Sequence, residues 1–280
     1  MRKSITLRAF GAQMPVPACL DLARAAGFDG VEVNLEPGAA VTLDSPPEAL
    51  RQFRAEVEAR GLAVSAVYSR QQWSSPITSQ HKAVRDEGYR IVEQLAEAGS
   101  ILGTKFVLVV PGAVDNSLFA AAPEIVPYDV AYDNARQGLR RLLSSAAERF
   151  NVHLAIETVW NKFLLSPLEM AQLVDGLGSE RLGVYLDVGN VLRTGFPEHW
   201  IGILAHRIQC VHFKDFRLAA DNGSGFVNLL EGDVNWPAVA GALRSINYDS
   251  WITAEVLPAY RYHPERLIYE TSASMDAIMA

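Results

Sequence analysis

Short apolar runs recur along the chain and are separated by longer segments with helical spacing. Apolar runs of this length, rich in β-branched residues, predict buried strands. We expect strands at 4–10, 30–34, 62–67, 104–110, 152–157, 182–187, 208–212 and 251–255.

The segments between these runs carry the start and stop signals of helices. Gly27 follows a helical pattern and indicates its end. Ser166, Pro167 and Glu169 form a typical helix N-terminus with serine as the cap, and Asn235 is the expected cap of a later helix. We expect helices at 16–26, 46–60, 80–99, 128–150, from 166 onward, and at 197–205, 236–246 and 264–279.

Eight strand-then-helix units in 280 residues predict an α/β fold, a single closed parallel (β/α)8 TIM barrel, which typically needs about 250 residues. An open doubly wound sheet is the alternative, but no glycine-rich phosphate turn follows the first strand. We find no linker or low-complexity tract and therefore expect one domain over 1–280. Such barrels carry their active sites at the C-terminal ends of the strands.

Composition narrows the class of protein. Hydrophobic residues make up 49% and charged residues 20% of the chain, which is ordinary for a globular protein. The net charge of −7 disfavours nucleic acid and acidic membranes as partners. Cys19 and Cys210 stand far apart in apolar contexts and are expected as buried thiols, in keeping with a reducing cytosol. Because we find no signal peptide and no apolar stretch of about twenty residues, we expect a soluble cytoplasmic protein.

Four successive predicted strands end in an ionisable residue, namely Glu157, Asp187, His212 and Glu255. A buried charge or imidazole is costly unless it is paired or bound to a metal, and strand ends converge in a barrel. One such carboxylate alone could equally cap a helix or pair with Lys or Arg, but four in succession favour a divalent-metal site. An oxygen-rich site with one imidazole suits Mn²⁺, Mg²⁺ or Co²⁺, whereas zinc more often has further His or Cys ligands.

Five short motifs surround these strand ends: AIE at 155–157, YLDVGN at 185–190, VHFKD at 211–215, EGDVNW at 231–236 and ITAE at 252–255. Together they resemble the xylose-isomerase-like sugar phosphate isomerase/epimerase family. That family includes ketose 3-epimerases and L-ribulose-5-phosphate (hexulose-phosphate) 3-epimerases, and it is related to endonuclease IV. The resemblance covers most of the chain and is strongest between Glu157 and Glu255.

The resemblance implies one divalent metal ion held by Glu157, Asp187, His212 and Glu255, with Mn²⁺ expected first and Co²⁺, Mg²⁺ or Zn²⁺ as alternatives. It also implies a metal-dependent enzyme that epimerises or isomerises a ketose or ketose phosphate at C3. Glu157 and Glu255 would remove the α-proton and return it on the opposite face, while the metal stabilises the enolate charge. The expected partner is a small sugar or sugar phosphate, and relatives of this kind are often homodimers or homotetramers.

Further residues are candidates for contact with the substrate. Several ketose 3-epimerases have a histidine three residues after the metal-binding aspartate, where this chain has Asn190, which can hydrogen-bond a hydroxyl but carries no charge. Arg217 could reach substrate oxygens or a phosphate, or face solvent, and Glu32 could contact a sugar hydroxyl or form a salt bridge. Lys214 is another candidate and is expected to form an ion pair with Asp215 beside the metal site. The expected aromatic wall comprises Tyr68, Trp73, Trp160 and Phe163.

Three other functions stay open on the sequence alone. The same metal site could serve a lyase acting on 3-keto sugars or C-glycosides, or a dehydratase, since these also need removal of an α-proton. A non-catalytic sugar-binding subunit is disfavoured because all four ligand residues are present. A metal-dependent nuclease is disfavoured by the negative charge, and because only His212 of the six histidines stands clearly at a strand end.

Overall fold

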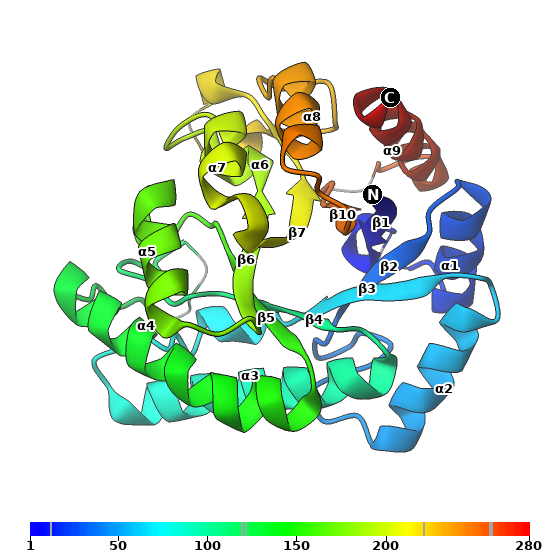
Figure 1. Cartoon of the computed structure of the whole chain (residues 1–280). Coiled ribbons are helices and arrows are strands. Elements are labelled where there is room, and N and C mark those ends of the chain that lie inside the picture. Colours follow the sequence, from blue (N-terminus) through cyan, green and yellow to red (C-terminus); the bar gives the residue numbers. More distant parts are fainter. Residues whose placement is uncertain (12, 119, 121, 221, 258–259) are drawn as a thin grey trace.

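Eight strands close into a parallel barrel in the computed structural model, which describes the chain except for residues 12, 119, 121, 221 and 258–259. Around the barrel the order is β1-β10-β7-β6-β5-β4-β3-β2, and the helices form an outer ring (Figure 1). The predicted (β/α)8 architecture is confirmed. The barrel strands are β1 (Arg2–Thr6), β2 (Gly30–Asn34), β3 (Ala63–Tyr68), β4 (Phe106–Val109), β5 (His153–Glu157), β6 (Leu182–Asp187), β7 (Ile208–Phe213) and β10 (Trp251–Ala254).

Helices follow the strands in the expected alternation. The α-helices are α1 (Val16–Ala25), α2 (Pro47–Glu58), α3 (Lys82–Leu102), α4 (Tyr128–Leu142), α5 (Pro167–Leu177), α6 (Val188–Val191), α7 (Pro197–Leu204), α8 (Trp236–Ser245) and α9 (Pro264–Met279). A π-helical segment, η3 (Leu143–Glu148), continues α4, and a short antiparallel pair, β8 (Asp215–Phe216) with β9 (Phe226–Val227), lies outside the barrel. The remaining 3₁₀ turns are η1 (Leu7–Ala9), η2 (Arg70–Trp73), η4 (Ala205–Arg207), η5 (Leu218–Ala220) and η6 (Gly223–Gly225).

Two predicted helix caps are present. The backbone N–H of Glu169 donates to the hydroxyl of Ser166 over 3.2 Å, and the N–H of Ala238 donates to the side-chain oxygen of Asn235 over 3.2 Å. Each cap satisfies one of the backbone donors that a helix start leaves without an intrahelical acceptor. Local sequence therefore fixes where α5 and α8 begin.

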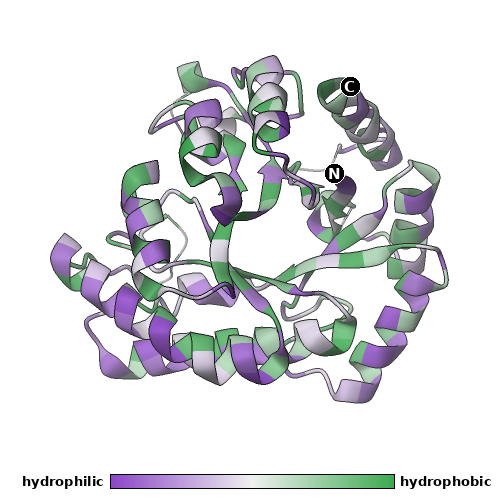
Figure 2. Cartoon of the chain, in the orientation of Figure 1, coloured by the Kyte–Doolittle hydropathy of each residue, from purple (hydrophilic) through white to green (hydrophobic). Residues whose placement is uncertain are grey.

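The apolar core has two layers. One lies between the strands and the ring of helices, and Figure 2 shows hydrophobic residues concentrated on the strands and polar ones on the outer faces of the helices. The other fills the barrel interior and includes Ala66, Leu108, Tyr185 and Cys210. Both cysteines are free and buried, as predicted.

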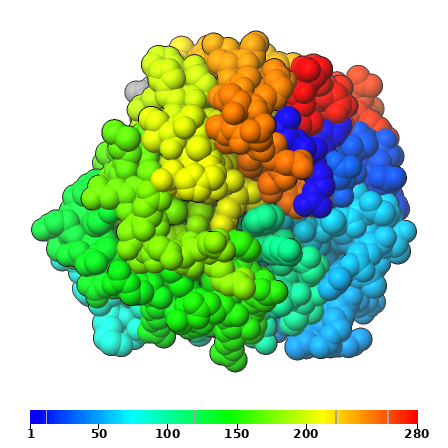
Figure 3. All heavy atoms as spheres, viewed as in Figure 1, coloured from blue at the N-terminus to red at the C-terminus, as the bar shows by residue number. Residues whose placement is uncertain are grey.

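The first and last strands close the barrel. β1 pairs with β10 in parallel register, and the amino group of Met1 lies 2.7 Å from the carboxylate of Asp249, just before β10. Figure 3 shows the first residues, in dark blue, packed against this orange segment. Within the described residues, no helix has both the length and the apolar character needed to cross a bilayer.

The first strand is shorter than the sequence predicts. The sequence predicts a strand over 4–10, but β1 ends at Thr6 and η1 follows at Leu7–Ala9. Pairing with β2 ends at Thr6 and pairing with β10 at Ile5, so the chain has no further parallel partner at the barrel rim. The early turn brings Arg8 to the cavity at the barrel mouth.

Candidate metal centre and substrate cavity

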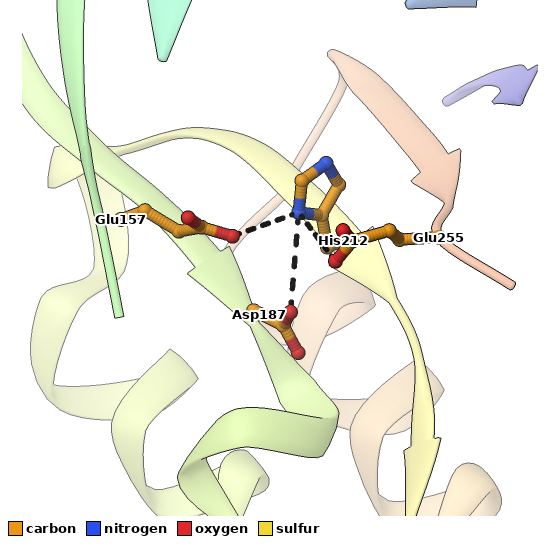
Figure 4. A group of neighbouring side chains, drawn as sticks. All are labelled: Glu157, Asp187, His212 and Glu255. Carbon is orange, nitrogen blue, oxygen red and sulfur yellow. Dashed lines mark hydrogen bonds and ion pairs between the residues drawn. The ribbon is translucent and has the colours of Figure 1, made fainter. Parts of the chain in front are cut away.

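The four predicted ligand residues meet at one end of the barrel. Glu157 and Asp187 are the last residues of β5 and β6, His212 lies near the end of β7, and Glu255 directly follows β10. One ligand atom from each of the four lies within 4.8 Å of all the others. Figure 4 shows Glu157 and Glu255 entering from opposite sides, with His212 and Asp187 between them. The C-terminal strand ends thus gather the groups that the sequence singles out.

The imidazole of His212 has a defined orientation. Its Nδ1 lies 3.2 Å from Glu157, 3.8 Å from Glu255 and 4.0 Å from Asp187. Its Nε2 lies 3.0 Å from Oε2 of Glu32 on β2. The side chain of His212 is 2% exposed, so both ring nitrogens have these carboxylates rather than solvent as hydrogen-bond partners. This geometry leaves Nδ1 as the nitrogen that faces the three carboxylates.

Glu32 lies below this cluster, inside the barrel. It is 1% exposed, and its Oε2 also accepts the hydroxyl of Tyr185 over 2.8 Å. Of the two interpretations of Glu32, contact with an ionisable neighbour is the one seen, while the residue does not line the cavity above. A carboxylate on the outer nitrogen of a ligating histidine is typical of metal sites, where it fixes the ring and increases its basicity.

Lys214 adds a cation to the cluster. Its ammonium lies 2.6 Å from Glu255 and 3.3 Å from Asp187. Burial would lower the pKa of Lys214, but these carboxylates outweigh burial and raise it, so the side chain stays charged. The prediction of an ion pair between Lys214 and Asp215 is wrong. In the described part of the chain, the Lys214 ammonium pairs with Asp187 and Glu255, at the ends of β6 and β10, instead.

Asp215 serves the loop that precedes α8. Its carboxylate accepts the backbone N–H groups of Leu230, Gly232 and Val234 at 3.0–3.2 Å and the indole N–H of Trp236 at 2.9 Å. A Cβ at Gly232 would collide with this carboxylate, so the loop can wrap so closely only around a glycine. Asp215 therefore organises the EGDVNW motif rather than pairing with Lys214.

The two glutamates of the cluster have different proton affinities. Burial raises the pKa of Glu157 to about 7. Burial would also raise the pKa of Glu255, but the cationic Lys214 and His212 outweigh it and lower the pKa to about 2. For His212, burial would lower the pKa, whereas Glu32 and Glu157 outweigh it and raise it well above the usual value. The metal-free site therefore binds protons near neutral pH.

The donor set fits a divalent cation. Three carboxylates and one imidazole nitrogen converge within a radius that a single ion can bridge, and hard, oxygen-rich sites of this kind suit Mn²⁺, Mg²⁺ or Co²⁺. Three carboxylates so close together repel one another, and Lys214 and His212 offset that repulsion only in part. Glu157, Asp187, His212 and Glu255 are thus the residues that could hold the ion.

A cavity of about 400 Å³ opens above the cluster. Glu157 and Glu255 line it together with Asn190 and Lys214, whereas Asp187 and His212 lie beneath its floor. Of the expected aromatic wall, Tyr68, Trp73 and Trp160 line the cavity. Phe163 does not: it is buried against Tyr128 and Tyr132 behind the site.

Trp160 is held firmly in this wall. Its indole N–H donates to the backbone carbonyl of Asn190 over 3.1 Å, and its ring stacks on Phe226 with centroids 4.8 Å apart. The side-chain amide of Asn190 donates to the carbonyl of Thr158 over 2.9 Å. These contacts join the loop after β5 to the short helix α6, whose first turn is capped by Asp187.

The arginines that line the cavity differ from the one that the sequence predicts. Arg217 is exposed, outside the cavity, and its Nε donates to the carbonyl of Glu231 over 2.8 Å. Arg8 and Arg70, which the sequence did not suggest, line the cavity. Their sequence signal is weak, because Arg8 lies within a predicted strand and Arg70 in a polar loop. The position two residues after the β3 strand end was the available clue to Arg70.

Known proteins share this fold. Residues 20–278 match the family model described as xylose isomerase-like TIM barrel. A curated relative, 2-epi-5-epi-valiolone 7-phosphate 2-epimerase of Actinoplanes sp., is 28% identical over 185 residues, which are 66% of this chain and 61% of the relative. The match therefore spans about three fifths of that relative's length.

Solved structures resemble the chain over almost its whole length. A structure of L-ribulose 3-epimerase has a TM-score of 0.78 at 20% identity and covers 99% of this chain and 94% of its own. The IOLI protein with a binding zinc atom has a TM-score of 0.81 at 16% identity, covering 100% and 98%. At such identities the likeness shows the fold rather than the activity. Since the family model matches nearly the whole chain, the chain belongs to the xylose isomerase-like TIM barrel family.

Proposed function

We propose that the chain is a divalent-metal-dependent enzyme that epimerises or isomerises a ketose or ketose phosphate by moving a proton at C3, next to the carbonyl. The observation that carries this proposal is the position of two residues. Glu157 and Glu255 are the members of the four-residue cluster that line the cavity, while Asp187 and His212 lie beneath it. A substrate in the cavity would therefore meet two carboxylates.

The two carboxylates approach from different directions. β6 and β7 lie between β5, which carries Glu157, and β10, which precedes Glu255. In epimerisation, one carboxylate takes the proton from C3, and the other, in its acid form, gives a proton to the opposite face of the same carbon. Glu157 and Glu255 enter the cluster from opposite sides, so that each carboxylate would serve one face of the substrate.

Glu157, Asp187, His212 and Glu255 would hold one divalent cation, expected to be Mn²⁺, and its charge would stabilise the negative charge that develops on the substrate oxygen. Glu32 would hold His212 in place from below. Lys214 would keep Glu255 ionised and contact substrate hydroxyls, and Asn190 would accept or donate a hydrogen bond at the cavity edge. Trp160 and Tyr68 would exclude water along the apolar face of the sugar.

The names of similar proteins agree with this chemistry. The curated relative is named as a sugar-like phosphate 2-epimerase and one structural neighbour as a ketose 3-epimerase. Each of these reactions inverts a carbon centre. A zinc atom bound to another neighbour supports a divalent ion in this fold without fixing its identity.

Product analysis tests the proposal against the lyase and dehydratase alternatives. The protein is supplied with Mn²⁺, Co²⁺ or Mg²⁺ and incubated with free and phosphorylated ketoses, and the products are identified by NMR. We expect an epimer or isomer with every atom of the substrate retained. A product that has lost water or a glycosidic fragment would contradict the proposal, as would the absence of any product across the panel with metal bound.

A further inference from the structure

The cavity has an uneven distribution of charge. The acidic cluster occupies the side formed by β5, β6, β7 and β10. Arg70 follows β3, and β3 lies opposite β7 in the order of strands around the barrel. Arg70 therefore stands across the barrel mouth from His212 and its carboxylate neighbours, on the wall of the same cavity.

The backbone of Arg70 is held by a hydrogen bond, whereas its side chain is exposed. Its backbone N–H donates to the carboxylate of Glu36, and Ser69 caps the short turn η2 by accepting the N–H of Gln71 over 3.3 Å. Within the described part of the chain, the guanidinium makes no hydrogen bond or ion pair. An exposed arginine at a cavity wall without an internal partner has its planar set of donors available for a ligand.

Arg8 connects the two sides of the cavity. Its Nη1 lies 3.6 Å from Glu255 and donates to the hydroxyl of Tyr68 over 3.3 Å. Tyr68 stands two residues before Arg70 at the end of β3. The guanidinium of Arg8 is partly exposed in the cavity. Positive charge thus extends from beside the acidic cluster to the β3 side of the mouth.

We propose that Arg70, supported by Arg8, binds a terminal phosphate monoester of the substrate, so that the substrate is a phosphorylated ketose. The proposal rests on the function proposed above. A phosphate dianion is attracted by the guanidinium of Arg70, which lies on the cavity wall across the barrel mouth from the reacting carboxylates. A guanidinium binds such a group through two parallel N–H···O bonds. The substrate then lies with its reacting carbon over Glu157 and Glu255 and its phosphate toward Arg70.

Binding of unreactive analogues tests this subsite without requiring turnover. Glucitol 6-phosphate, glucitol and gluconate are titrated by calorimetry into the Mn²⁺-loaded wild type and into R70Q, R70K and R51Q. Arg51 is an exposed arginine on α2 and serves as the matched control. We expect R70Q to bind glucitol 6-phosphate about 10- to 100-fold more weakly than the wild type. Glucitol affinity should change less than about twofold, R70K should be intermediate, and R51Q should match the wild type.

Other outcomes would overturn the assignment. Equal affinity for glucitol 6-phosphate in the wild type and R70Q would remove Arg70 from the subsite. Gluconate bound more tightly than glucitol 6-phosphate, with dependence on Arg70, would show that the anionic group is a carboxylate. Failure of the proposed epimerase function would appear separately, as no product from any ketose, and would leave these binding differences measurable.

Discussion

Oε2 of Glu32 lies 3.0 Å from Nε2 of His212, and this contact turns Nδ1 of the same ring toward Glu157, Asp187 and Glu255. The two residues are 180 positions apart in the chain and come from β2 and β7, across the barrel. A carboxylate on the far nitrogen fixes both the orientation and the tautomer of a ligating histidine. Glu32 therefore contacts the candidate metal cluster from within the barrel and does not line the cavity above it.

Removing this support should weaken metal binding. We expect Glu32→Gln to bind Mn²⁺ about 10- to 100-fold more weakly, as is usual for such supporting contacts, with an unchanged far-UV circular dichroism spectrum. Tyr185→Phe is the matched control, because it deletes the other partner of Glu32 and keeps the contact with His212. Calorimetric titration with Mn²⁺ measures both. Equal affinity in wild type and E32Q would show that His212 is oriented without Glu32.

Metal binding should release protons and strengthen as pH rises. In the metal-free protein the pKa of Glu157 is about 7 and that of His212 is raised well above its usual value. Both groups must lose their protons to act as ligands. Below pH 7 protons compete with the metal, so affinity falls with acidification. Titrations in two buffers of different ionisation enthalpy give the number of protons released, and a value of zero at pH 6 would contradict this account.

Lys214 should keep Glu255 ionised at low pH when Mn²⁺ is saturating. Its ammonium lowers the pKa of Glu255, so replacing it raises that pKa, and Glu255 then gains its proton at a higher pH. We expect the acid limb of the kcat/KM profile of Lys214→Met to move to higher pH than in the wild type. Lys105→Met, at an exposed lysine beside β4, should leave the limb in place. A Lys214→Met limb that coincides with the wild type would rule out this role.

Asp215 should matter for stability more than for chemistry. Asp215→Ala leaves several backbone N–H groups and the indole N–H of Trp236 without their acceptor. Because each orphaned buried donor costs about 1–3 kcal/mol, we expect a loss of more than about 3 kcal/mol in the free energy of unfolding. Urea denaturation measures it. Asp133→Ala, at an exposed aspartate on α4, should change stability by less than about 0.5 kcal/mol.

The sequence predicts the barrel and the cluster for the same reason. Apolar runs reveal buried strands, and an ionisable residue at the end of such a run stands out against them. This pattern predicts Glu157, Asp187, His212 and Glu255, and the convergence of strand ends in a barrel brings them together. The same pattern points to Glu32, but its contact with His212 on a distant strand depends on strand register, which no local pattern encodes.

The cavity wall was harder to predict, because it is built from loops. Arg8 reaches it only because β1 ends early, where its neighbours stop pairing. Arg217 lies in the loop after His212, which contributes Phe226 and Val227 to the cavity, but the side chain of Arg217 instead bonds to the carbonyl of Glu231. Lys214 and Asp215 do not form the predicted ion pair, because adjacent residues in an extended segment point to opposite sides. Loop geometry of this kind depends on tertiary contacts rather than on propensity.

The most direct test of the account is exchange of the C3 proton with solvent. Ketoses, free and phosphorylated, are incubated in D₂O with the Mn²⁺-loaded protein, and the C3–H signal is followed by NMR. We predict that the signal disappears with the wild type and persists after chelation of the metal. In E157Q and E255Q we expect the rate to fall by about 10²- to 10⁴-fold. Full retention of the C3–H signal by every ketose with metal bound, or exchange at the wild-type rate in E157Q, would contradict the central claim.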